Sequence, residues 1–269
     1  MNNSPELSVV MSVYNGQDHL AEAIESILNQ TYTDFEFIII NDGSTDATKN
    51  IIENYAVKDK RIIPVHQQNI GLTRSLNKGI EEAKAKYIAR MDADDVSQQN
   101  RLETQMEFLK SSQEIVLCGT WFLEDNDGKG VKIRKYPVDD YALRKKIKYV
   151  NNFCHPSVVF LKDAFIKAGN YDERCSTGQD FELWMRLCNY GKIANIPKIL
   201  VRRRIGTGNT ISWQRRNEKS KLWEIIYKKH FKHWNQVNII LFIRFYIPLL
   251  FYQYIPIPLI KIIRFFRYR

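Results

Sequence analysis

Short apolar runs alternate with helical apolar stripes along the first ninety residues of the chain. The apolar runs predict strands at residues 7–13, 35–40, 62–66 and 87–90. Apolar residues spaced three and four apart predict helices at residues 17–30, 47–56 and 71–85. This alternation favours an α/β fold with a parallel sheet and right-handed crossovers. The continuous apolar end of the second run indicates a strand buried on both faces.

The rest of the chain predicts a second group of elements. Helices are predicted at residues 97–111, 139–149, 162–168 and 179–190, and strands at residues 115–123, 131–136 and 157–161. The polar run at residues 125–130 predicts a hairpin turn. The sequence contains no internal repeats, and its 269 residues suit one domain with an appendage.

Polar or aromatic residues stand directly after three of the predicted strands: Tyr14, Asp42 and the pair Asp92 and Asp94. In open sheets of this kind, ligands bind outside the carboxyl ends of the strands. In extended backbone Asp92 and Asp94 share a face, and Asp95 points to the opposite one as a structural or helix-side residue. A hard divalent cation would relieve the repulsion within the pair. The alternative is a solvated acidic loop whose aspartate caps the next helix.

The sequence lacks two common nucleotide-binding motifs, which limits the ways in which it could bind a phosphate. The sequence has neither a G-x-G-x-x-G turn after its first strand nor a G-x-x-x-x-G-K-[ST] loop. A diphosphate would therefore be held by a metal on carboxylates, together with a cation such as Arg74 or Lys78.

The basic charge of the chain is concentrated at its C-terminal end. Residues 202–269 contain 15 Lys and Arg but only Glu218 and Glu224, whereas the chain as a whole carries a net charge of +10. Apolar, aromatic and basic residues are mixed there, and no run of about 20 apolar residues exists to span a membrane. We expect residues 213–269 to form helices in an anionic membrane interface. A cap on the core or a dimer interface are the alternatives, and the segment is too apolar to favour nucleic acid.

Two further features of the sequence indicate the compartment in which the protein is expected. Residues 1–7 are polar and the apolar run after them is short, so no signal peptide is predicted. The four cysteines are scattered without a C-x-x-C pair, which favours free thiols in a reducing compartment over a zinc site or a disulfide framework.

Five motifs stand in register along the chain. They are residues 9–15, residues 34–46, Asn69-x-Gly71, residues 91–95 and residues 179–184. Together they resemble glycosyltransferase family 2, whose members are inverting enzymes of the GT-A fold, over residues 6–212. The resemblance implies an α/β, Rossmann-like and mostly parallel central sheet flanked by helices, followed here by a helical C-terminal appendage.

The resemblance also implies roles for individual residues. Ser12 and Tyr14 match positions that hold the nucleoside of the donor, and Asp42 matches the acid that reads the uracil edge. Arg74 resembles the cation near the diphosphate. Asp92 matches the position near the ribose and the sugar, Asp94 the ligand of Mn²⁺ or Mg²⁺, and Asp180 the catalytic base.

Two departures from the family pattern concern the site. Gln179 precedes the base where many relatives have Glu, and the base itself is retained. Many relatives also carry an Arg-x-His element whose His can join the metal, whereas residues 202–212 contain no His. Water would then complete the metal shell, or an Arg would contact the diphosphate, so no third metal ligand is assigned.

Three side chains near these motifs are interpreted as structural and not as part of the site. We expect Trp184, at helical spacing from Leu183 and Leu187, to pack in the core. Asp46 is expected to cap the helix that follows it. His155 is interpreted as a structural or turn residue, with a place near the acceptor as the alternative.

These observations predict a glycosyltransferase domain at residues 1–212 and a basic amphipathic region at residues 213–269. We expect a sugar to move from a UDP-sugar, or a dTDP-sugar, to a lipid-linked or growing glycan in cell-surface polysaccharide synthesis. The enzyme would be peripheral, on the cytoplasmic face of the cell membrane, and could form a homo-oligomer. The alternatives are a nucleotidyltransferase on a similar fold and a non-catalytic membrane-associated scaffold.

Overall fold

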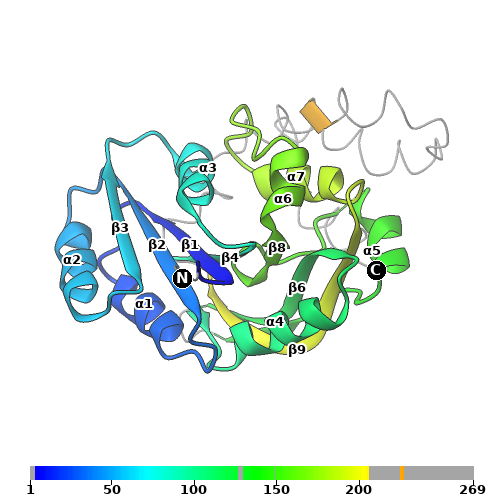
Figure 1. The fold of residues 1–269 in the computed structure, drawn as a ribbon, viewed down its shortest axis with the longest axis horizontal. Coiled ribbons are helices and arrows are strands. Elements are labelled where there is room, and N and C mark those ends of the chain that lie inside the picture. The colour runs from blue at the N-terminus through cyan, green and yellow to red at the C-terminus, as the bar shows by residue number, and fades with distance from the viewer. Residues whose placement is uncertain (1–3, 127–129, 149, 206–224, 227–269) are drawn as a thin grey trace.

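The first four strands alternate with three helices, as the apolar pattern predicts. The structure is a computed structural model that describes residues 4–126, 130–148, 150–205 and 225–226. The elements run β1 (Leu7–Val13), α1 (Leu20–Leu28), β2 (Phe35–Asp42), α2 (Thr48–Lys58), β3 (Ile62–Gln67), α3 (Leu72–Glu82) and β4 (Tyr87–Asp92). The four strands are parallel and lie in the order β3-β2-β1-β4 (Figure 1). The predicted α/β fold is confirmed.

Five more strands continue this sheet beyond β4. They are β5 (Val96–Ser97), β6 (Ile115–Asp125), β7 (Val131–Arg134), β8 (Val159–Leu161) and β9 (Lys192–Arg204). The order across the sheet is β3-β2-β1-β4-β8-β6-β9-β5, and β7 pairs with β6. β8 is antiparallel to both of its neighbours, while β9 runs parallel to β6. The parallel half is thus joined to a mixed half through one short strand.

One prediction about the elements is wrong, and one strand was not predicted. The helix expected from residue 97 is α4 (Arg101–Ser111), because Val96 and Ser97 pair with β9 instead. The 13-residue strand β9 has no counterpart among the predicted elements. Its apolar pattern is interrupted at Pro197 and Lys198, and its ladder with β6 has register irregularities near Trp121, so its side chains follow no simple alternation.

Helices cover both faces of the sheet (Figure 1). One apolar layer packs β1, β2 and β4 against α1, α2 and α4. The other packs them against α3, α5 (Asp140–Ile147), α6 (Lys162–Lys167) and α7 (Gln179–Leu187). Trp184 of α7 is fully buried in this second layer, as predicted.

Strand alternation decides which layer each polar side chain meets. Val10, Ile40 and Ile88 belong to the layer with α3 and α7. Ser12, Asp42, Arg90 and Asp92 stand at even spacings from these three, so their side chains leave the sheet on that same face. The polar groups at the end of the parallel strands therefore face α3 and α7.

Most of the C-terminal quarter lies outside the described residues. The predicted boundary at residue 212 and the amphipathic region at 213–269 fall there, apart from Ile225 and Ile226. Ile226 is fully buried in the apolar layer that contains Trp184. Within the described part of the chain, none of the helices combines the length and apolar character needed to traverse a bilayer.

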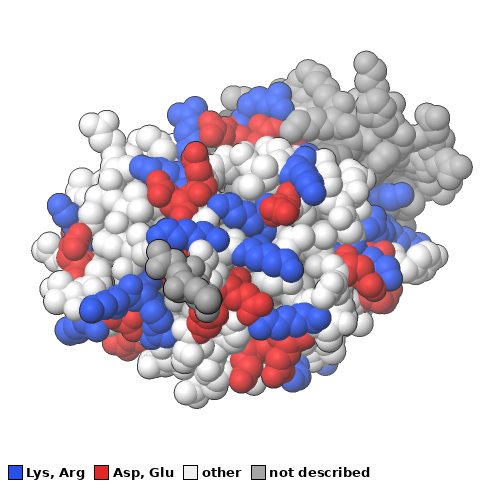
Figure 2. Space-filling model, in the orientation of Figure 1, with Lys and Arg blue, Asp and Glu red and all other residues white. Residues whose placement is uncertain are grey.

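All four cysteines are described and free, in agreement with the prediction: Cys118, Cys154, Cys175 and Cys188. On the face shown in Figure 2, acidic and basic side chains are interspersed rather than separated by sign.

Candidate active site

The site begins where β1 and β4 end side by side. Ser12 lies opposite Asp92 in the parallel ladder between these strands, and its side chain is buried. Tyr14 follows β1 and is 52% exposed, so its ring is open to a ligand from solvent. The structure thus brings two of the predicted nucleoside-binding positions to the rim that carries the acidic residues.

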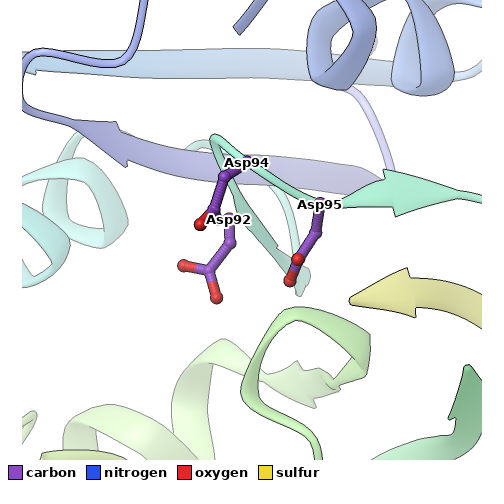
Figure 3. A group of neighbouring side chains, drawn as sticks. All are labelled: Asp92, Asp94 and Asp95. Carbon is purple, nitrogen blue, oxygen red and sulfur yellow. The ribbon is translucent and has the colours of Figure 1, made fainter. Parts of the chain in front are cut away.

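Three carboxylates cluster after β4. Asp92, Asp94 and Asp95 each place an oxygen within 4.8 Å of the others (Figure 3). The prediction that Asp95 points away is wrong, because the chain turns at Ala93 and Asp94 and leaves extended conformation. Only one of the two carboxylate oxygens of Asp95 makes a hydrogen bond that supports the fold. Its Oδ1 accepts a hydrogen bond of 2.8 Å from the backbone N–H of Arg204, while its buried Oδ2 has no hydrogen-bond partner among the described residues.

The cluster is electrostatically strained without a cation. Burial, followed by the charge of Asp92, raises the pKa of Asp94. Burial, together with Asp92 and Asp94, raises the pKa of Asp95 well above its ordinary value. All ligands on offer are hard oxygens, and one of them is a buried oxygen without a partner, so the residues fit a divalent ion such as Mg²⁺ or Mn²⁺.

Arg90 is a buried cation beside this cluster. Its side chain is 2% exposed and forms an ion pair with Asp92. Nη1 makes that ion pair, while Nε and Nη2 have no hydrogen-bond partner among the described residues. A buried guanidinium with so few partners is costly unless other anions complete its surroundings.

Asp180 lies at the start of α7. Gly178 precedes the helix in the left-handed conformation, with φ of 69°, which allows the chain to turn into it. Burial raises the pKa of the Asp180 carboxyl, while hydrogen bonds from the Phe181 backbone and the Asn151 side chain act to lower it. A half-buried carboxylate with a raised pKa is suited to general-base chemistry.

Asp92 leaves β4 on the face of the sheet against which α7, the helix of Asp180, packs. The charges of both carboxylates act to raise the pKa of Tyr171, whose largest cause is burial of the phenol. The charge of Arg90 also reaches both Tyr171 and Asp180. Residues from β4 and α7, 88 positions apart, therefore line one region on the α3 and α7 face of the sheet.

Asp42 is more enclosed than its predicted role suggests. It is 2% exposed, and its Oδ1 accepts hydrogen bonds of 2.9 Å from Gln67 Nε2 and from the Ile70 backbone. Its Oδ2 accepts one of 2.9 Å from the Gly71 backbone. Asp42 thus holds the loop between β3 and α3, and its contact with a nucleobase stays a prediction.

Arg74 has an acidic partner outside the cluster of Asp92, Asp94 and Asp95. It lies in the first turn of α3 and pairs with Glu173, Nε to Oε2, at 3.0 Å. Both side chains are about half exposed, and such surface pairs contribute little free energy. The guanidinium can leave Glu173 at small cost, and its role at the diphosphate remains a prediction.

His155 is a neutral, packed side chain. Its Nε2 lies 2.8 Å from the hydroxyl of Tyr171, and its ring contacts Trp184 edge-on. Burial, then the charges of Arg90 and Arg203, lower its pKa well below the usual range. These contacts support the structural interpretation. Asp46 bonds to the start of α2, as predicted, since its Oδ1 accepts a hydrogen bond of 3.0 Å from the backbone of Thr48, although the N-cap position itself is Ala47.

Comparison with known proteins identifies the family. Residues 8–168, more than half of the chain, match the family described as Glycosyl transferase family 2. The chain belongs to this family. An uncharacterized glycosyltransferase of Methanocaldococcus jannaschii is 35% identical over 241 residues, which cover 86% of this chain and 80% of that protein. The O-antigen biosynthesis glycosyltransferase WbnJ of Escherichia coli is 37% identical over 188 residues, covering 68% and 72%.

Solved structures of glycosyltransferases share the fold. S. aureus TarS 1-349 in complex with UDP-GlcNAc superposes with a TM-score of 0.70 at 16% identity, covering 91% of this chain and 70% of that one. The mannosyltransferase PcManGT from Pyrobaculum calidifontis, in complex with GDP-Man and Mn²⁺, has a TM-score of 0.68 at 13% identity, covering 93% and 73%. The predicted GT-A architecture of this family-2 glycosyltransferase is confirmed.

Three residues of this family-2 site are missing from the sequence-based predictions. Arg90 carried a usable signal, since it is a cation inside an apolar strand, two positions before Asp92 and on the same face. Asn151 carried none, and Arg203 was covered only by the general expectation that an Arg within residues 202–212 contacts the diphosphate. They reach Asp180 and the acidic cluster only through the packing of the segment before η1 (His155–Ser157) and the pairing of β9.

Proposed function

We propose that this protein is an inverting, divalent-cation-dependent glycosyltransferase with a nucleoside-diphosphate sugar as its donor. A UDP-sugar is favoured, with a dTDP-sugar as the alternative, because the acceptor-only carboxylate of Asp42 suits the ring N–H of uracil or thymine. The proposed acceptor is a lipid-linked or growing glycan in cell-surface polysaccharide synthesis. The E. coli relative named for O-antigen biosynthesis and the Erwinia amylovora relative named for amylovoran biosynthesis support that acceptor class.

One observation carries the proposal. A cluster of three carboxylates follows β4, and α7, which packs on the face of the sheet that Asp92 enters, carries a fourth carboxylate, Asp180, whose pKa is raised by burial. Asp94, with Asp92 and Asp95 beside it, would hold a divalent ion, which when bound offsets the negative charge that develops on the leaving diphosphate. Membership of the family favours glycosyl transfer over nucleotidyl transfer.

We assign the role of the base to Asp180, and its raised pKa supports this assignment. An acceptor hydroxyl attacks the anomeric carbon, its oxygen forms the new glycosidic bond, and the bond to the β-phosphate oxygen breaks. The hydroxyl proton passes to Asp180, and the electron pair of the broken bond leaves with the diphosphate. Attack from the face opposite the leaving group inverts the anomeric centre, and such a reaction needs a single base. Oδ2 of Asp180 accepts a hydrogen bond from Asn151, which orients the carboxylate.

A donor screen tests the proposal. Purified protein is heated with UDP-glucose, UDP-galactose, UDP-GlcNAc, dTDP-rhamnose or GDP-mannose, each with and without Mn²⁺, and release of nucleoside diphosphate is followed in parallel. We expect one donor to raise Tm and to release nucleoside diphosphate only with the metal present. If no donor stabilises the protein or is cleaved, the proposal is wrong. Proton NMR of the product, compared with the anomeric configuration of the donor, tests inversion.

The C-terminal region leads to a second proposal, on location. Residues 213–269 combine apolar and aromatic residues with Lys261, Arg264 and Arg267, a composition that suits an anionic membrane surface on the cytoplasmic side. Deleting residues 235–269 should release the protein from anionic liposomes. Full-length protein with the three named cations changed to Gln serves as a milder variant, and neutral vesicles serve as the control. Unchanged partitioning of both variants would exclude the anchor.

A further inference from the structure

Tyr14 is held in place through its neighbours in the chain and not through its own side chain. It is 52% exposed, and within the described residues its side chain makes no hydrogen bond or aromatic contact. On one side the chain is fixed by β1, which ends at Val13 and lies between β2 and β4. On the other side the chain bends at Asn15, whose backbone is left-handed with φ of 50°. The direction in which the Tyr14 ring leaves the sheet therefore depends on what holds Asn15.

Asn15 is bonded to the loop after β2 through both its backbone and its side chain. Its N–H donates a hydrogen bond of 3.0 Å to Ser44 Oγ, and its Oδ1 accepts one of 2.8 Å from the backbone N–H of Thr45. Left-handed backbone is unfavourable for most side chains, and asparagine is one of the few that tolerate it. Asn15 thus combines two properties, since it accommodates the bend after Tyr14 and supplies the oxygen that binds Thr45.

The loop that receives Asn15 is itself held in place. The N–H of Ser44 donates a hydrogen bond of 3.0 Å to Oδ1 of Asn41, a buried residue of β2. Gly43 has φ of +75°, and a Cβ added there would lie 2.5 Å from the backbone nitrogen of Asn69, in the loop after β3. A residue without Cβ is needed for so close an approach. The loops after β1, β2 and β3 therefore support one another, and Asn15 joins the first of them to the second.

Gln17 makes the same kind of contact two residues after Asn15. Its Oε1 accepts a hydrogen bond of 3.0 Å from the backbone N–H of Ala47, in the same loop after β2. Gln17 is exposed and is not adjacent to Tyr14 in the chain. It therefore joins the same two loops without fixing the bend that follows the exposed ring.

We propose that Asn15 is a positioning residue that fixes the ring of Tyr14 in the direction in which it stacks on the nucleobase of the donor. The proposal rests on the proposed function, since it assigns a residue to the nucleoside part of the same donor site. A ring that is already oriented before the ligand arrives loses less conformational entropy on binding, so the same stacking contact gives higher affinity. Asn15 acts on the donor only through Tyr14.

A double-mutant cycle tests whether Asn15 acts through Tyr14. Calorimetry in Mn²⁺ measures the affinity of UDP, dTDP and GDP for wild type, Asn15→Ala, Tyr14→Ala and the double variant. We expect each single variant to bind the preferred nucleoside diphosphate about 10-fold more weakly, since stacking of a base on an aromatic ring is lost or misaligned. The double variant should bind it within about twofold of Tyr14→Ala, because the ring that Asn15 orients is already absent.

Two further variants separate positioning from a general effect on the loops. Asn15→Gly tolerates the left-handed backbone but lacks the oxygen that binds Thr45, so it should lose less affinity than Asn15→Ala. Gln17→Ala is the matched control, because it removes an acceptor of a backbone N–H from the same loop. We expect Gln17→Ala to bind the nucleoside diphosphate within about twofold of wild type.

Other results would overturn the assignment. If Asn15→Ala binds the nucleoside diphosphate as tightly as wild type, Asn15 does not position the ring. If the double variant loses the product of the two single losses, Asn15 acts independently of Tyr14. Equal losses in Gln17→Ala and Asn15→Ala would indicate a general effect on the loops. If Tyr14→Ala binds as wild type does, the role of Asn15 fails while the donor site stands. If wild type binds none of the three diphosphates, the proposed function itself fails.

Discussion

Asn151 donates a hydrogen bond of 2.7 Å from Nδ2 to Oδ2 of Asp180, a residue 29 positions later in the chain. The amide is itself oriented, because its Oδ1 accepts a hydrogen bond of 3.1 Å from the backbone of Phe153. Asn151 therefore presents its donor side to the carboxylate. A donor to a carboxylate stabilises the charged form, which opposes the effect of burial at this site.

This contact predicts the pH dependence of transfer. Asp180 acts as a base only when deprotonated, and burial raises its pKa, so activity is lost on the acid side at a higher pH than an exposed aspartate would give. Asn151→Ala removes a hydrogen bond that lowers this pKa, so the acid limb of kcat/KM should move to still higher pH. The measurement is the pH–rate profile of the variant, with Asn189→Ala, at an exposed position, as control. An unmoved acid limb would show that Asn151 does not tune the base.

Replacing the base separates chemistry from binding. Asp180→Asn keeps the size of the side chain but cannot accept the acceptor proton, so transfer should fall by about 10²- to 10⁴-fold. Affinity for the donor should stay within about twofold, because the altered group does not bind the nucleotide. Initial rates and calorimetry check this, with Asp163→Asn on the exposed side of α6 as the matched control. Retained transfer in Asp180→Asn would place the base elsewhere.

Removing a carboxylate from the cluster should affect metal-dependent binding. Asp94→Ala deletes the proposed metal ligand, and we expect donor affinity in Mn²⁺ to fall by at least about tenfold. In EDTA, the variant and wild type should bind the donor with similar affinity. Asp163→Ala, outside the cluster, should behave as wild type in both buffers. Equal affinity of Asp94→Ala and wild type in Mn²⁺ would argue against a metal on this residue.

The helix that carries the base depends on a buried ion pair. Glu182 is fully buried and pairs with Arg186 at 2.5 Å, and Arg186 Nη2 also donates to the Asn170 backbone at 2.7 Å. Arg186→Ala removes the ion-pair partner of this buried carboxylate and should lower the free energy of unfolding by about 3–5 kcal/mol. Arg144→Ala breaks the more exposed pair with Asp140 at the same i,i+4 spacing and should cost about 1 kcal/mol or less. Urea unfolding of both variants measures the difference, and equal losses would contradict the role of burial.

The acidic cluster shows where the alternation of side chains along a strand predicts their positions and where it fails. The apolar run of β4 and the carboxylates after it predict an anionic site at the strand end, and the structure has one. The same rule of alternating faces fails for Asp95, because it holds only while the backbone is extended. At Ala93 the chain turns, and the third carboxylate joins the other two (Figure 3).

Sequence alone determined the parallel half of the fold and the edge at which the polar residues gather. Strand–helix alternation dictates parallel strands, and parallel strands bring their carboxyl ends together whatever the rest of the chain does. It could not determine what faces that edge. Arg204 meets Asp94 across 110 positions, and Arg203 arrives with it, only because β9 pairs with β5 and β6. Contacts of that range depend on how distant elements pack, and no periodicity within one segment encodes them.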